Sequence, residues 1–95
     1  MLTTGNQLRA ARALAGIDQG TLAERAGVNI NTIGAMEKRG SEGLKSGLDT
    51  IRAVMNVLEA EGIEFLNHGQ PGVRLKKNEG AASIPVDNRN ASNDK

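Results

Sequence analysis

The sequence has no cysteine, a single aromatic residue, Phe65, and a single histidine, His68. Without cysteine the chain forms neither a disulfide nor a cysteine-based metal site, and one histidine cannot make a zinc site by itself. We expect His68 to be a solvated residue in a glycine-rich turn. Because aromatic side chains are almost absent, the core has to be built from Leu, Ile, Val, Met and Ala.

Long apolar runs are also missing, since no stretch approaches the roughly 18 apolar residues of a membrane span. The N-terminus lacks the basic-then-apolar profile of a secretory signal. We therefore expect a cytoplasmic protein with no membrane partner. The sequence shows no phosphate-binding loop, no metal-ligand spacing and no grouping of a nucleophile with an acid or base. We expect no catalytic residues, no cofactor and no metal, and hence no enzyme.

The chain has 95 residues and a formal net charge of +1. This length fits one small domain, and a charge so near zero neither requires nor excludes a nucleic-acid partner. Residues 78–95 are rich in Asn, Ser, Asp and Ala, so they cannot bury enough apolar surface to offset the entropy of ordering. We predict a folded domain over residues 1–77 and a disordered tail over residues 78–95.

The apolar spacing within residues 1–77 predicts a small all-α domain of four to five helices. Thr4 is a suitable N-cap for a first helix that Gly16 ends, and Asp18 for a second helix that Gly27 ends. Gly20 lowers the helix propensity of the second helix by about 1 kcal/mol relative to Ala, which suggests a close approach by another backbone. The stripe expected on the inner face of the first helix is Leu8, Ala11, Leu14 and Ala15.

A third helix is expected over residues 29–38, with Asn29 as its cap and Ile30, Ile33 and Met36 facing inward. Residues 40–47 contain glycines and serines and predict a loop. Ser46 or Asp49 would cap a fourth helix that Gly62 closes. Its inner stripe is Leu48, Ile51, Val54, Met55 and Leu58. A short β-hairpin is plausible over residues 63–75, pairing 63–66 with 73–75 across a turn at Pro71-Gly72.

The stretch from Gln19 to Lys38 resembles the helix-turn-helix of the Cro/CI repressor family, also called the Xre family. The similarity extends from about Leu8 to about Leu66. The residues that carry it are Arg12, Gly16-Ile17-Asp18-Gln19, Leu22-Ala23, Ala26-Gly27-Val28, Thr32-Ile33 and Met36-Glu37.

The resemblance implies a sequence-specific DNA-binding transcriptional regulator, a repressor that binds a two-fold operator in double-stranded DNA as a homodimer. The helix over residues 29–38 would lie in the major groove, and Arg12 and Glu37 would form a structural pair between the first and third helices. The dimer surface, by elimination, would be the fourth helix and residues 63–75. The DNA-binding residues that the resemblance implies are Gln19, Thr21, Asn29, Asn31, Thr32, Ala35, Lys38 and Arg39.

Gly34 and Ala35 depart from the family pattern, because these positions often carry larger polar side chains that reach bases. The alternative interpretation is a helix-turn-helix protein that acts mainly through protein partners. It would then be an antitoxin or an anti-activator, with a toxin or a transcription activator as its partner. Asn29 also has two interpretations, because the cap of the third helix and a contact to DNA each account for it.

Overall fold

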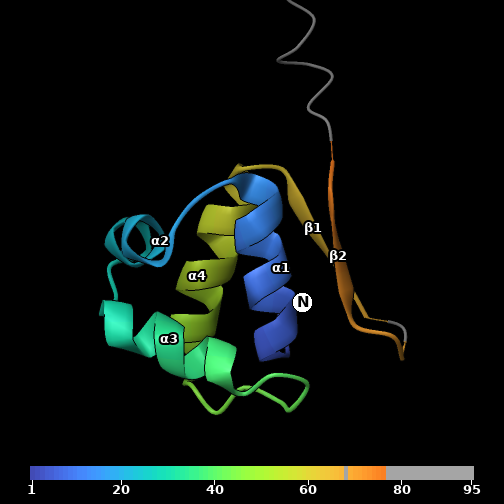
Figure 1. Cartoon of the computed structure of the whole chain (residues 1–95), viewed down its shortest axis with the longest axis horizontal. Helices are drawn as coiled ribbons and strands as arrows, with labels where there is room; N and C mark the ends of the chain where they lie inside the picture. The colour runs from blue at the N-terminus through green and yellow to red at the C-terminus, as the bar shows by residue number, and fades with distance from the viewer. Residues whose placement is uncertain (68, 77–95) are drawn as a thin grey trace, which may run out of the picture.

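The computed structural model of the chain describes residues 1–67 and 69–76. The expectations for His68 and for the tail over residues 78–95 lie outside the described residues. Within these residues the chain forms four helices followed by a two-stranded antiparallel hairpin, and Figure 1 shows their arrangement. The predicted small helical domain with a short hairpin is confirmed. The elements are α1 (Gly5–Ala15), α2 (Gln19–Ala26), α3 (Ile30–Lys38), α4 (Leu48–Ala60), β1 (Ile63–Leu66) and β2 (Gly72–Leu75).

The first three helices begin and end where their capping residues predict. Thr4, Asp18 and Asn29 have extended backbones, and each side chain accepts a hydrogen bond from an amide in the first turn of its helix. Gly16 and Gly27 end α1 and α2 in the left-handed region, with φ of 73° and 70°, which glycine adopts without steric strain. None of the described helices is long and apolar enough to cross a membrane.

The start of α4 differs from the prediction. Its N-cap is Gly47, without a side-chain hydrogen bond, rather than Ser46 or Asp49. Gly47 has the extended backbone that a cap requires, whereas Asp49 already lies inside the first turn. The helix ends at Ala60, and Gly62 follows with φ of 96°, so the glycine closes the helix as expected.

The core differs from the predicted stripes at the ends of helices. Leu14, Ile30 and Leu48 were expected to face inward, but they are 44%, 48% and 55% exposed. Each lies in the first or last turn of its helix, where fewer residues of the same helix flank a side chain than in the middle. The buried apolar residues that form the core are Leu2, Leu8, Ala11, Leu22, Ala23, Ile33, Met36, Val54, Leu58 and Ile63.

The start of α1 lies against the end of α3 with backbone touching backbone. A Cβ placed on Gly5 would overlap the carbonyl oxygen of Met36 and lie 2.8 Å from that of Glu37. The Asn6 amide donates to the carbonyl oxygen of Gly40 at 2.8 Å. Only glycine permits this approach. At Gly20, by contrast, the expected backbone approach is wrong, because an added Cβ would meet only side-chain atoms at 3.5 and 3.8 Å.

The hairpin lies beside α1, on the side away from α2 (Figure 1). Its register pairs Phe65 with Val73, and both side chains pack against the core. Gln7, 2% exposed, ties the hairpin to α1. Its side-chain Nε2 donates to the carbonyl oxygens of Leu66 at 3.0 Å and Gly72 at 3.2 Å. The hairpin is thus held by α1, which a two-stranded ribbon requires for stability.

Gly5 and Gly34, which lie in α1 and α3, predict opposite effects of the same substitution. Gly5→Ala forces α1 away from α3, so we expect it to lower the free energy of unfolding by about 2–3 kcal/mol. Gly34→Ala adds a methyl group where nothing lies within 4 Å, so we expect a gain of about 1 kcal/mol in helix propensity. Urea unfolding followed by circular dichroism measures both. Equal midpoints for Gly5→Ala and the wild type would contradict the close packing of α1 on α3.

Candidate functional site

The exposed side of α3, the start of α2 and one side of α1 enclose an open hollow of about 780 Å³. Both helices of the predicted helix-turn-helix, α2 and α3, therefore contribute to one concave surface together with α1. Its lining residues are Arg9, Arg12, Gln19, Ile30, Asn31, Gly34, Ala35, Glu37 and Lys38. We call this surface the α3 hollow.

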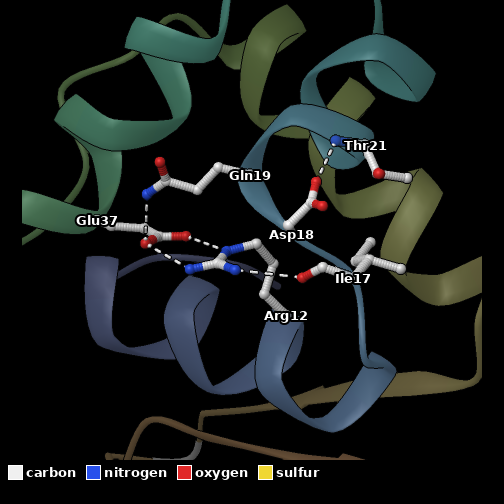
Figure 2. A network of polar contacts seen from close by, with 6 residues as sticks. All are labelled: Arg12, Ile17, Asp18, Gln19, Thr21 and Glu37. Carbon is white, nitrogen blue, oxygen red and sulfur yellow. Dashed lines mark hydrogen bonds and ion pairs between the residues drawn. The ribbon is translucent and has the colours of Figure 1, made fainter.

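A network of hydrogen bonds centred on Glu37 fixes the three elements around the hollow (Figure 2). Arg12, the partner that the resemblance implies, donates from Nε to Glu37 Oε2 at 2.6 Å and from Nη2 to Oε1 at 3.1 Å. Gln19 donates from Nε2 to the same Oε1 at 3.0 Å. Arg12 Nη1 also donates to the carbonyl oxygen of Ile17 at 3.2 Å. The network joins α1, the α1–α2 turn, α2 and α3.

Both members of the central ion pair stay charged. Burial raises the pKa of Glu37, but hydrogen bonds from Arg12 and Gln19, with the charges of Arg12 and Arg9, outweigh it and hold the pKa below its ordinary value. The hydrogen bonds to Glu37 raise the pKa of Arg12. The one carboxylate that lines the hollow is therefore neutralised by a partner, and the net charge of the lining comes from the remaining cations, Arg9 and Lys38.

The face of α3 that lines the hollow is raised at its ends and low in its middle. Ile30, Gly34 and Lys38 follow at four-residue spacing, so they form one row along the helix. Asn31 and Ala35 form the neighbouring row. At Gly34 an added Cβ would meet nothing within 4 Å. The middle of this face thus carries nothing larger than a methyl group, between Ile30 and Asn31 at one end and Lys38 at the other.

Four of the eight residues implied by the resemblance line the hollow, namely Gln19, Asn31, Ala35 and Lys38. The other four do not. Asn29 lies exposed at the start of α3, and its Oδ1 accepts a hydrogen bond from the Asn31 amide at 2.7 Å. Thr32 is half-buried.

Thr21 and Arg39 have partners within the chain. The Thr21 amide donates to the Asp18 carboxylate at 2.7 Å, and hydrogen bonds from Thr21 lower the pKa of Asp18. Arg39 is directed toward the loop after α3, where Nε donates to the carbonyl oxygen of Gly43 at 2.9 Å. Its guanidinium also lies 3.3 Å from Glu42.

Three lining residues were not predicted as site residues: Arg9, Ile30 and Gly34. The spacing does contain a signal for Arg9, because it precedes Arg12 by three residues and so lies on the same side of α1. Ile30 was placed in the core because its spacing to Ile33 fits an inward stripe. Its exposure depends on which residue begins the helix, and spacing alone does not determine that.

No group of three or more metal-ligating side chains that could hold an ion occurs within residues 1–67 and 69–76. No family model matches the chain, and the search of curated proteins also finds no match. What the α3 hollow binds therefore has to be inferred from its shape, its charge and its side chains.

The lowered pKa of Glu37 predicts a stability that depends on pH. At pH values above the ordinary pKa of 4.5, the Glu37 carboxylate stabilises the folded chain. This contribution is lost as the pH falls through the lower pKa that Glu37 has in the folded state. At pH 7 we expect Glu37→Gln to cost about 2 kcal/mol. This cost is smaller than the loss of stability when one partner of a fully buried ion pair is removed, because the Arg12 side chain is partly exposed to solvent. The difference from wild type should shrink progressively below pH 4.5.

The matched control is Glu64→Gln, which removes a carboxylate from the exposed ion pair with Arg74. Exposed pairs contribute about 0–1 kcal/mol, so we expect little change at any pH. Urea unfolding at a series of pH values measures all three proteins. A constant difference between Glu37→Gln and wild type down to pH 3, a value about 1.5 below the ordinary pKa, would refute the assignment.

Proposed function

We propose that this chain is a sequence-specific DNA-binding transcriptional regulator of the Cro/CI helix-turn-helix type. In this proposal α3 lies in the major groove and the chain acts as a homodimer repressor on a two-fold operator. The observation that carries the proposal is the α3 hollow, a concave surface lined along one side by an exposed face of α3. Its two lining charges without an ion-pair partner among residues 1–67 and 69–76, Arg9 and Lys38, are both positive. A major groove admits one α-helix.

The phosphate contacts differ from those that the resemblance implies. The start of α2 is less available to a phosphate, because the Asp18 carboxylate already accepts from the Thr21 amide and Gln19 Nε2 already donates to Glu37. Arg9 and Lys38 are exposed at the rim of the hollow. These two cations are the residues that we assign to phosphates, which position the protein without reading sequence.

We assign the contact with a DNA base to Asn31. It is exposed in the first turn of α3, it lines the hollow, and its side chain is not used as the helix cap, since Asn29 has that role. An asparagine amide can form two hydrogen bonds with adenine N6 and N7. Asn31 is therefore the main reader of base edges in this proposal.

A dimer is required because one nine-residue helix buries too little surface for tight, specific binding. Two copies of α3 about 34 Å apart would match successive turns of the major groove. Leu48 on α4 and Leu75 on β2 are large apolar side chains about half exposed to solvent. They mark α4 and the hairpin as the proposed contact between copies.

Double-stranded DNA selected by this protein from a random pool provides the test. We expect Asn31→Ala to abolish the preference for one base pair in each half-site of the selected sequence, the pair that Asn31 contacts. Lys38→Gln should weaken binding to all sequences and make the salt dependence shallower by about one unit of log–log slope, or about two for a dimer. Arg74→Gln, which removes an equal charge from the exposed hairpin, should leave the slope unchanged. Fluorescence anisotropy at several salt concentrations measures each affinity, and sizing of the complex gives its stoichiometry.

Absence of any DNA binding at low salt would contradict the proposal. If a toxin or a transcription activator were then recovered bound to the chain at high salt, the alternative function as an antitoxin or anti-activator would replace it. Steep salt dependence separates the two cases, because it arises from counterions released by phosphate contacts.

A further inference from the structure

The exposed face of α3 in the hollow carries three residues without polar side-chain atoms, and the cations Arg9 and Lys38 line the same hollow. These three lining residues are Ile30, which is 48% exposed, Gly34 and Ala35. The Ile30 side chain extends toward the start of α2, since its Cδ1 lies 3.8 Å from the place that a Cβ on Gly20 would occupy. We call Ile30, Gly34 and Ala35 the apolar floor.

The fold itself gives no reason for two of these three residues. An exposed isoleucine adds nothing to the core, and a glycine inside a helix lowers its propensity. Within residues 1–67 and 69–76, no neighbouring atom occupies the space above Gly34, so close packing among these residues does not explain the missing side chain. Gly5, in contrast, is required by the backbone of α3. The packing of the described residues therefore does not account for the apolar floor, which has the character of a binding surface.

The chemistry of the surface defines that ligand as an apolar group carried on a polyanion. The major groove of DNA presents such a group in the C5-methyl of thymine, whereas the other base edges there present hydrogen-bond donors and acceptors. Ile30, Gly34 and Ala35 have no side-chain polar atoms with which to pair those groups. A donor or acceptor pressed against the floor would lose its water without gaining a partner.

We propose that the apolar floor binds the methyl group of a thymine, so that each half of the DNA site carries a thymine opposite the middle of α3. The inference rests on the proposed DNA binding and adds the identity of one base. Ile30 supplies the contacting wall, and the absence of a side chain at Gly34 leaves room for the methyl group. The neighbouring Asn31 reads an adjacent base edge, so the apolar and the polar side chains of this face read different features.

The experiment uses the full chain and the DNA sequence that it selects from a random pool, with each thymine replaced in turn by uracil. Uracil lacks only the methyl group. At one thymine in each half-site we expect affinity to fall about fourfold, as burial of a single carbon predicts. With Ile30→Ala the affinity for the thymine DNA should fall by a similar factor, and the ratio between thymine and uracil DNA should approach one.

Leu14→Ala is the matched control, because Leu14 is also a half-exposed apolar residue but does not line the hollow. It should keep the wild-type ratio between thymine and uracil DNA. Gly34→Ala separates recognition from folding. We expect it to raise thermal stability while it lowers affinity for thymine DNA and the thymine-to-uracil ratio, because the added methyl group fills the space above the floor.

The outcomes distinguish the inference from the proposed function. If a DNA sequence is selected but no uracil replacement changes affinity, the inference is overturned and the proposed function stands. The same holds if Ile30→Ala keeps the wild-type ratio. If no DNA sequence is selected at all, the proposed function fails, and the methyl site fails with it.

Discussion

The contact between α1 and α3 is the constraint on which the rest of the molecule depends. A helix of nine residues is marginal in water by itself, so α3 has to be held by its neighbours. Gly5 lets the two backbones touch at one end of α3. Arg12 lies two turns further along α1 than Gly5, and its guanidinium binds Glu37 of α3. These two contacts fix the exposed face of α3 relative to Arg9 and Gln19, and the hollow exists because that relation is fixed.

The residues of α3 divide into two sets with different demands. Ile33, Met36 and Glu37 are buried and determine where the helix lies. Ile30 and Gly34 lie outside this buried set, and Gly34 weakens the helix that it belongs to. A position that lowers stability without serving the fold is where stability and function are expected to oppose each other. The exposed face thus has the character of a binding surface, while the buried face has that of a core.

Features that depend on residues close together in the sequence were predicted better than features that depend on contacts between distant segments. Caps and turns act within a few residues, so Thr4, Asp18, Gly27 and Asn29 were predicted correctly, and so was the hairpin. Contacts between distant segments leave no such mark. Leu2 lies outside every helical stripe yet is 1% exposed, and nothing near Gly5 indicates that the backbone of α3 crosses it. In the site, the resemblance predicted that Asn31 and Lys38 belong to the exposed surface of α3. The hydrogen bond from Gln19 to Glu37 and the exposure of Ile30 depend instead on how the helices lie in three dimensions.

Gln7 has a consequence for the order in which the chain can fold. Its side chain is buried, and its amide nitrogen is satisfied by carbonyl groups 59 and 65 residues further along the chain. While the protein is being synthesised, α1, α2 and α3 emerge well before β1 and β2. The side-chain amide of Gln7 therefore stays in contact with water until the hairpin has been synthesised. The pairing of α1 with α3 spans fewer residues and closes a shorter loop. Assembly around the hollow can therefore precede docking of the hairpin, which completes the burial of Gln7 only after synthesis has passed β2.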